Sequence, residues 1–148
     1  MELQFYYLSS FKEKTYFLDS FSKIFFSSFN QKYSKQVFFW KYLRPQTEES
    51  IIQQIIVDKK IVGYRGLWKV KNYLDMYQCI DTCINPNFQG KGIFKLSNQN
   101  LISNFGTLFN YPNKRSKSGY LKSGWREISK MNIYLNKLEN FEFCNWDK

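Results

Sequence analysis

Apolar positions near the start of the chain first alternate with polar ones and then recur at helical spacing. The alternation of Leu3, Phe5 and Tyr7 predicts a short first strand. Ser10 and Glu13 have the spacing of a capping box, which marks the start of a helix. The apolar stripe that follows predicts a long helix packed on the core: Phe17, Phe21, Ile24, Phe25 and Phe29. A second, short helix is expected to carry Val37, Phe38, Trp40 and Tyr42 and to end before Pro45.

The middle of the chain predicts three consecutive strands and then a helix. Residues 51–57 and 61–70 flank the turn at residues 58–60 and predict a hairpin. Residues 77–84 predict a third strand, rich in β-branched, aromatic and Cys side chains, which Pro86 ends. From Gly92 onward, apolar and small residues at helical spacing predict a helix that stops at Gly106: Ile93, Leu96, Ser97, Leu101 and Phe105.

The last third of the chain predicts shorter elements. We expect a strand over residues 107–111 stopped by Pro112, a short helix over 116–121, a strand over 125–135 and a last strand over 141–146. Meandering strands before one crossover helix favour an α+β fold, an α/β sandwich with a mixed sheet. With 148 residues and no linker or repeat, the chain is expected to form a single domain over residues 1–148.

The turn Gln89-Gly90-Lys91-Gly92 lies where a predicted strand is followed by a predicted helix. At a helix start several backbone N–H groups lack intrahelical partners, and the helix dipole is positive. Two glycines allow the main chain to approach a ligand closely. The turn is therefore a candidate phosphate cradle, and the alternative is a tight connection without a ligand.

The formal net charge of +10 suggests a polyanionic ligand, either a nucleotide cofactor or a nucleic acid. Most of the 22 basic residues are Lys, and they are scattered along the chain rather than clustered. Lys, Asn, Ile, Phe and Tyr are abundant together, which an AT-rich genome would produce without selection for a partner. We therefore expect no nucleic-acid partner.

The three cysteines, Cys79, Cys83 and Cys144, are odd in number and have no zinc-ligand spacing. The chain has no His, which excludes a His-based metal site and a Ser-His triad, and we expect no metal. No uncharged run reaches the roughly 18 residues needed to cross a bilayer. The first residues lack the basic and then apolar layout of a signal peptide. We expect a reduced, cytoplasmic protein without a membrane partner.

Two motifs in the chain follow patterns that occur together in one group of proteins. The first is Gln/Arg-x-x-Gly-x-Gly/Ala after a strand that ends in an apolar-x-Pro pattern. Here Ile84-Asn85-Pro86 precedes Gln89-Gly90-Lys91-Gly92-Ile93-Phe94, with Phe94 in place of the final small residue. The second is an Asn, a Tyr seven residues later, and then x-x-x-Gly-aromatic, which matches Asn113, Tyr120 and Gly124-Trp125. With these two motifs the chain resembles the GNAT superfamily of acyl-CoA-dependent N-acetyltransferases. The resemblance covers residues 51–135, and residues 39–43 and 112–116 match a subset of the family.

The resemblance implies a GNAT-like mixed, mostly antiparallel sheet flanked by helices on both faces, with acetyl-CoA as co-substrate. It places the CoA pyrophosphate over the N–H groups of residues 90–95, near Lys91 and Lys95, which alternatively belong to a solvated helix start. It also implies that the third strand of the meander splays from its neighbour at its end, where its backbone would polarise the thioester carbonyl. The cofactor-binding residues implied are Thr82, Cys83, Ile84, Gln89, Gly90, Lys91, Gly92, Ile93, Phe94, Lys95 and Asn113. Phe94 must then point away from the cofactor.

The family pattern also implies catalytic roles. Tyr120 would donate a proton to the leaving thiolate, and the alternative is a buried Tyr packed under Trp125. Asn113 would hydrogen-bond the cofactor arm or else cap the helix that follows it.

The general base is left open by the motifs. Asp81 is the only carboxylate on the strand beside the implied acetyl site, and we expect it to share a strand face with Cys79 and Cys83. It is a candidate for accepting the proton of the amine or for binding the amine. Otherwise alignment of the reactants carries most of the rate. No evident base would activate Cys83 as an acyl-carrying nucleophile.

We therefore expect an N-acetyltransferase that moves an acetyl group from acetyl-CoA directly to a primary amine, on an amino sugar, a small amine or a protein. The rival interpretation is a catalytically degenerate GNAT-like domain that serves as a CoA-binding or interaction module. It is favoured by Phe94 and by Leu108, which stands where some relatives have a catalytic Glu. A basic nucleic-acid-binding protein is disfavoured by the scattered lysines, and a homodimer is left open.

Overall fold

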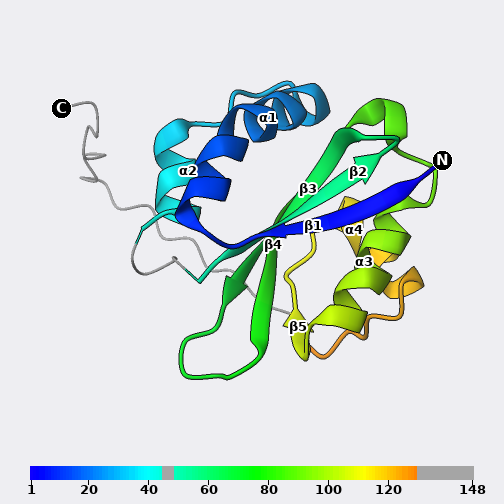
Figure 1. Ribbon diagram of the computed structural model, residues 1–148. Helices are drawn as coiled ribbons and strands as arrows, with labels where there is room; N and C mark the ends of the chain where they lie inside the picture. The colour runs from blue at the N-terminus through cyan, green and yellow to red at the C-terminus, as the bar shows by residue number, and fades with distance from the viewer. Residues whose placement is uncertain (45–48, 130–148) are drawn as a thin grey trace, which may run out of the picture.

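The structure is a computed structural model that describes residues 1–44 and 49–129 (Figure 1). Its elements are β1 (Leu3–Leu8), α1 (Phe11–Phe29), α2 (Lys35–Tyr42), β2 (Ile51–Val57), β3 (Lys60–Lys69), β4 (Met76–Ile84), the short 3-10 helix η2 (Pro86–Phe88), α3 (Ile93–Asn104), β5 (Thr107–Phe109) and α4 (Lys114–Lys122). The predicted order of strands and helices is confirmed as far as α4.

The strands form one sheet in the order β1-β2-β3-β4-β5. β1 to β4 pair antiparallel, and β5 pairs parallel to β4 after the crossover through α3. The β4–β5 pairing is short, because it joins only Met76, Tyr77 and Gln78 to residues 107–109. The predicted mixed, mostly antiparallel sheet is confirmed.

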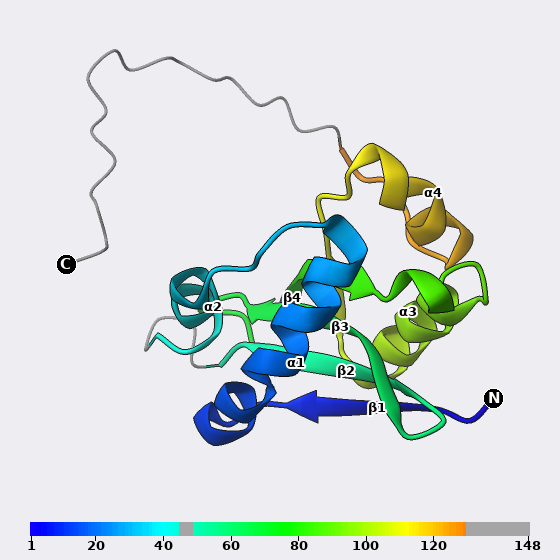
Figure 2. The ribbon, with the colours of Figure 1, turned by 90° about the horizontal axis from the view of Figure 1, so that it is seen from above.

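Helices cover both faces of this sheet, as predicted. Figures 1 and 2 show α1 and α2 on one face and α3 and α4 on the other. Side chains alternate along the strands, so that Ile52 and Tyr64 pack toward α1, whereas Ile55 and Leu67 pack toward α3. Each face therefore has its own apolar core.

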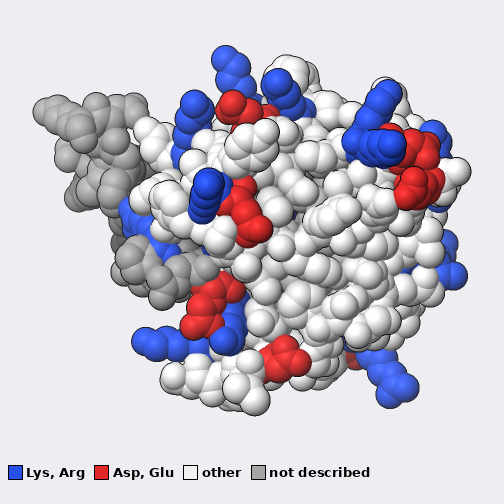
Figure 3. Space-filling model, viewed as in Figure 1, with Lys and Arg blue, Asp and Glu red and all other residues white. Residues whose placement is uncertain are grey.

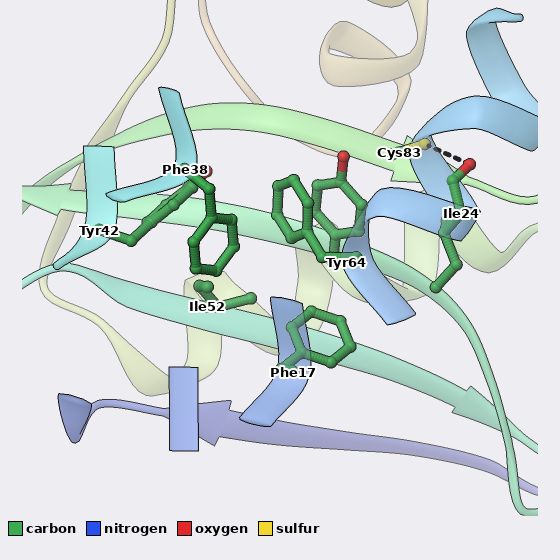
Figure 4. Close-up of a cluster of buried hydrophobic side chains, with 8 residues drawn as sticks. Phe17, Ile24, Phe38, Tyr42, Ile52, Tyr64 and Cys83 are labelled. Atoms are coloured by element: carbon green, nitrogen blue, oxygen red, sulfur yellow. Dashed lines mark hydrogen bonds between the residues drawn. The ribbon is translucent and has the colours of Figure 1, made fainter. Parts of the chain in front are cut away.

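The core beneath α1 and α2 is built largely from aromatic rings (Figure 4). Phe21 stacks on Tyr64 with ring centroids 3.6 Å apart and meets Phe38 and Tyr42 edge to face. Burying such a side chain contributes about 1.5–3 kcal/mol, which explains why the apolar stripe of α1 decides its position. The stripe is buried over most of its length, whereas Phe29 at its end is exposed.

α1 begins with the predicted capping box. The Glu13 N–H donates to Ser10 Oγ at 3.2 Å, and the Ser10 N–H donates to Glu13 Oε2 at 3.0 Å. The hydrogen bond from the Ser10 backbone, together with one from its hydroxyl, lowers the pKa of Glu13 below its ordinary value. These bonds satisfy backbone donors that a helix start leaves open.

α3 packs on the sheet through a layer of buried polar side chains. Ser97 Oγ donates to Gln53 Oε1 on β2 at 2.8 Å, and Gln53 Nε2 donates to Asn100 Oδ1 at 3.1 Å. Beside them Arg65 Nη1 on β3 donates to Asn98 Oδ1 at 2.8 Å. These bonds join α3 to two strands and hold it in one position along the sheet.

The last third of the chain differs from the prediction in three places. β5 ends at Phe109 rather than at residue 111, because its pairing with β4 ends there. α4 begins at Lys114 rather than at residue 116, because Asn113 caps it. Residues 125–129 form no strand, and Trp125 instead packs on Tyr120. The rest of the predicted strand over 125–135, and all of the one over 141–146, lie outside the described residues.

Charged side chains are spread over the surface. Figure 3 shows Lys and Arg at many separate places on the viewed face, several of them beside Asp or Glu. Lys69 pairs with Glu49, and Lys117 pairs with Glu127. Within residues 1–44 and 49–129, none of the helices has the length and apolar character needed to cross a membrane.

Candidate functional site

The candidate site lies along the edge of β4 that faces β5. Pairing with β5 stops at Gln78, so in the described chain β4 has no strand beside it on this edge from Cys79 to Ile84. The predicted separation of the two strands is present at Thr82, Cys83 and Ile84. Backbone groups on an unpaired strand edge are available to hydrogen-bond another molecule.

β4 carries a bulge at Asp81. This residue has a φ of 44°, and the register between β3 and β4 shifts between Tyr64 and Gly66. A bulge changes which way the neighbouring side chains point. Cys79 packs on the α3 side and Cys83 on the α1 side. The prediction that Asp81 shares a face with both cysteines is therefore wrong for Cys79.

The Asp81 carboxylate lies on the α1–α2 side of the sheet, where several donors hold it. Lys41 Nζ donates to both oxygens at 2.8 Å, and the hydroxyls of Tyr33 and Tyr42 donate to Oδ2 at 2.8 and 2.9 Å. Burial, reinforced by the charge of Asp81, raises the pKa of both tyrosines well above its ordinary value. They therefore remain protonated donors, and most acceptor positions of Asp81 are occupied.

The glycine turn leaves the N-terminus of α3 open. Gly90 and Gly92 have φ of 74° and 77°, and an added Cβ at either would meet no atom within 4 Å. Gly92 is the N-cap of α3, and no side chain caps the first N–H groups of the helix. Gln89 Nε2 donates to the carbonyl of Ile84 at 2.8 Å and so ties the turn to the end of β4. This geometry suits an anion such as a phosphate.

The first residues of α3 divide between surface and interior. Lys91 and Lys95 are exposed beside the turn, whereas Ile93 is buried in the core. Phe94 points into the protein, with its ring centroid 5.1 Å from that of Tyr120. The expectation that Phe94 points away from the cofactor stays a prediction, and in the structure its ring packs on Tyr120.

Tyr120 is buried on the α3–α4 side of the open edge, and only 4% of it is exposed. Its ring packs edge-on against Trp125 with centroids 4.9 Å apart, as the structural alternative predicts. Its hydroxyl also lies 3.5 Å from Thr82 Oγ1 on β4. The structure thus brings Tyr120 and Thr82 together, and it places the carboxylate of Asp81 on the opposite face of the same strand.

Asn113 caps α4. Its Oδ1 accepts a hydrogen bond from the Ser116 N–H at 3.0 Å. This is the capping role that the sequence offered as the alternative to a contact with the cofactor arm. The side-chain carbonyl is therefore committed to the helix, and the Nδ2 group remains for a ligand.

Arg65, on β3, is a buried cation that the sequence motifs do not mark. Its Nε donates to Thr82 Oγ1 at 3.0 Å, and its Nη1 donates to Asn98 Oδ1. Its guanidinium carbon lies 5.2 Å from the ring centroid of Phe94 and 5.6 Å from that of Tyr120. Nη2 has no hydrogen-bond partner, and Arg65 forms no ion pair with any described residue. The one signal in the sequence is a charge inside the otherwise apolar stretch of β3.

The thiols of Cys79 and Cys83 are buried. Burial raises the pKa of Cys79 to about 11, and it also raises that of Cys83. A thiol must ionise to act as a nucleophile. Neither cysteine is therefore prepared to carry an acyl group.

Comparison with known proteins finds no matching family model and no matching curated protein. Solved structures match over most of the chain. An aminoglycoside acetyltransferase from an uncultured soil metagenomic sample, in complex with sisomicin, has a TM-score of 0.62 and 18% identity, covering 91% of this chain and 97% of that chain. Glucosamine-6-phosphate N-acetyltransferase from Arabidopsis thaliana has a TM-score of 0.59 and 15% identity, with coverage of 92% and 100%. A predicted acetyltransferase from Clostridium acetobutylicum, solved with acetyl-CoA, has a TM-score of 0.62 and 11% identity, with coverage of 95% and 100%.

At such low identity these similarities establish the fold, and they agree with the two motifs in the sequence. Two of these three proteins are named as acetyltransferases, and the third is named as a predicted acetyltransferase. The chain therefore has the fold of the GNAT superfamily of acetyltransferases.

Proposed function

We propose that the chain, as a single domain over residues 1–148, is an N-acetyltransferase that moves an acetyl group from acetyl-CoA directly to a primary amine. The observation that carries this proposal is the uncapped, glycine-led N-terminus of α3 at the end of a strand whose edge is open. The N-terminus of α3 would hold a phosphate and the open edge of β4 would hold the acyl arm, so that together they would form one continuous site. The GNAT fold supports the proposal, and one matched structure was solved with acetyl-CoA.

The residues of the turn fit the pyrophosphate of CoA. The space above Gly90 and Gly92 is open, and the first N–H groups of α3 would donate to phosphate oxygens. Lys91 and Lys95 would add point charges nearby. Acetyl-CoA, when bound, supplies the acetyl group as a thioester. The backbone of residues 82–84, Gln89 through its tie to β4, and Nδ2 of Asn113 would hold and orient the rest of the molecule.

Two proton transfers accompany the reaction. The C–N bond to the amine forms as the C–S bond breaks, the amine loses one proton, and the thiolate gains one. Tyr120 would donate to the sulfur, and Asp81 would accept the proton of the amine directly or through water. These side chains lie on opposite faces of β4, so they would approach an acyl group at its edge from opposite sides. Alignment of the two reactants contributes about 7–11 kcal/mol in favourable cases.

A second candidate function is a catalytically degenerate domain that binds CoA or a protein partner. Two observations favour it. Both oxygens of Asp81 already accept hydrogen bonds, so few lone pairs remain to receive the proton of an amine. Tyr120 is almost fully buried, so a leaving sulfur would have to come close to it along the strand edge.

The melting temperature of the purified protein with acetyl-CoA, with ADP and without ligand tests the cofactor site. A ligand at 100 times its dissociation constant stabilises the folded state by about 2.7 kcal/mol. We expect a shift with acetyl-CoA that clearly exceeds the shift with ADP. No shift with either compound would contradict the proposed site.

Release of the CoA thiol then tests catalysis. Sisomicin and glucosamine 6-phosphate are rational first acceptors. One matched structure contains sisomicin, and another is of a protein named glucosamine-6-phosphate N-acetyltransferase. Thiol release that depends on the amine would support the enzyme, whereas binding without release would favour the degenerate domain. A cytoplasmic location and a homodimer are parts of the proposal that require separate measurements.

A further inference from the structure

Arg65 brings an unbalanced positive charge into the interior beside the candidate site. A buried charge is costly unless it is paired and hydrogen-bonded. Arg65 is fully buried, yet its neighbours are two neutral acceptors, Thr82 and Asn98, and the ring faces of Phe94 and Tyr120. Among the described residues, its Nη2 has no hydrogen-bond partner and no carboxylate pairs with it. Contacts with aromatic rings offset only part of such a cost.

The hydrogen bond from Arg65 occupies one lone pair of Thr82 Oγ1 and leaves the hydroxyl hydrogen available to donate. A guanidinium group can only donate, so Thr82 Oγ1 must accept from Arg65 Nε. The hydroxyl hydrogen of Thr82 is then free to point toward Tyr120 Oη, 3.5 Å away. When Thr82 donates in this way, the hydrogen of Tyr120 has to point elsewhere, and the open edge of β4 lies beside it.

We infer that Arg65 is a positioning residue that acts through Thr82. It directs a hydrogen-bond chain from Arg65 to Thr82 to Tyr120, and it supplies the counter-charge for the oxygen of Tyr120 when that oxygen becomes negative. This inference rests on the proposed acetyl transfer.

The proton transfers in this proposal begin when the C–S bond of the thioester breaks. The electron pair of that bond stays on sulfur, and sulfur takes the proton of Tyr120. A phenolate is left, which accepts the hydrogen bond from Thr82 close to the charge of Arg65. Solvent then returns a proton to the oxygen of Tyr120. The proton that the amine releases passes to solvent by way of Asp81.

The test is a double-mutant cycle between Thr82 and Tyr120. Thr82→Val removes the hydroxyl but keeps the branched shape of the side chain, whereas Thr82→Ser keeps the hydroxyl. Each substitution is made both in the native chain and in the Tyr120→Phe variant. Thr107→Val, at an exposed position on β5, is the matched control. Thioester cleavage of saturating acetyl-CoA is followed with the best trial amine, or with water as acceptor where no amine reacts. Calorimetry gives the dissociation constant of acetyl-CoA for every variant.

We expect Thr82→Val to lower kcat about tenfold or more, in keeping with the loss of one hydrogen bond to a charged group. The dissociation constant of acetyl-CoA should change less than about twofold, because no contact with the cofactor is lost. Thr82→Ser should recover most of the rate, and Thr107→Val should match the native chain. In the Tyr120→Phe background, Thr82→Val should have no further effect.

Arg65→Lys keeps a cation but loses the fork that reaches Thr82 and Asn98 together. A folded Arg65→Lys protein should bind acetyl-CoA normally and lose as much of kcat as Thr82→Val. An equal loss from Thr82→Val in both Tyr120 backgrounds, or no loss in either, would overturn the inference. Failure of the native chain to bind or cleave acetyl-CoA is a different result, because it would remove the proposed function before any variant is compared.

Discussion

Replacing Gly92 by Glu would place a carboxylate at the N-terminus of α3, where the proposed pyrophosphate lies. Gly92 has a φ of 77°, so an L-residue there costs about 1–2 kcal/mol of backbone strain. An added Cβ would meet no atom within 4 Å, so no neighbour has to move. Gly92→Gln carries the same strain and nearly the same volume without the charge. Comparison of the two variants therefore isolates the effect of charge on ligand binding.

The expected magnitude follows from Coulomb's law. At an effective dielectric constant of about 20 and a separation of about 5 Å, two unit charges interact by about 3 kcal/mol. Acetyl-CoA should therefore bind Gly92→Glu more than about a hundredfold more weakly than Gly92→Gln. The turn is exposed, so salt should screen this difference, since the Debye length falls from about 10 Å at 0.1 M to about 3 Å at 1 M.

Isothermal titration calorimetry at low and high NaCl measures the effect directly. Without ligand, Gly92→Glu should melt at or slightly above the temperature of Gly92→Gln, because both carry the same strain and a carboxylate at a helix N-terminus interacts favourably with the helix dipole. Equal affinities of Gly92→Glu and Gly92→Gln for acetyl-CoA at low salt would refute the phosphate site at α3. A difference that is unchanged by salt would show that the cause is not electrostatic.

Three further predictions test other parts of the structure. Tyr120→Phe removes the proposed acid but keeps the ring, so kcat should fall about a hundredfold or more while acetyl-CoA binds as before; equal losses in both would make Tyr120 structural. Gly66→Ala would push a methyl group against the hydroxyl of Tyr42, so urea unfolding should show a loss of about 1–3 kcal/mol; an unchanged midpoint would contradict this packing. The pKa of Glu13 is lower in the folded state than its ordinary 4.5, so its stabilising effect is present above that pH and is lost as pH falls through the folded value. Glu13→Gln should therefore lower the melting temperature at neutral pH, and this decrease should become smaller as the pH is lowered below 4.5; a decrease that is independent of pH would count against the capping bonds.

The elements that the sequence predicts well are those decided by near neighbours. The capping box at Ser10, the apolar stripe of α1 and the glycine turn before α3 each depend on residues a few positions apart. The order of helices and strands can therefore be predicted from residues that are near one another in the sequence. The turn at Gly92 could be recognised as a helix start for the same reason.

The parts that the sequence does not reveal depend on contacts between distant elements. Asp81 has a positive φ within a strand, and Lys41 and two tyrosines from residues 33–42, which are distant in sequence, hold its carboxylate there. Strict alternation therefore misplaces Cys79. Arg65 is buried because α3, α4 and β4 close around it, and no spacing along the chain reports such an enclosure.

The polar layer beneath α3 determines the register of the helix on the sheet, whereas an apolar interface would contribute mainly to stability. A slide of α3 by one turn, about 5.4 Å, would break the bonds of Ser97 and Asn98 together, so the helix has one permitted register. Apolar substitutes for buried polar groups are often neutral or stabilising, but they would pack almost equally well in neighbouring registers. Selection for heat resistance alone would therefore tend to erase this layer. The resulting protein would have a higher melting temperature, but its glycine turn would no longer lie at a fixed distance from the edge of β4.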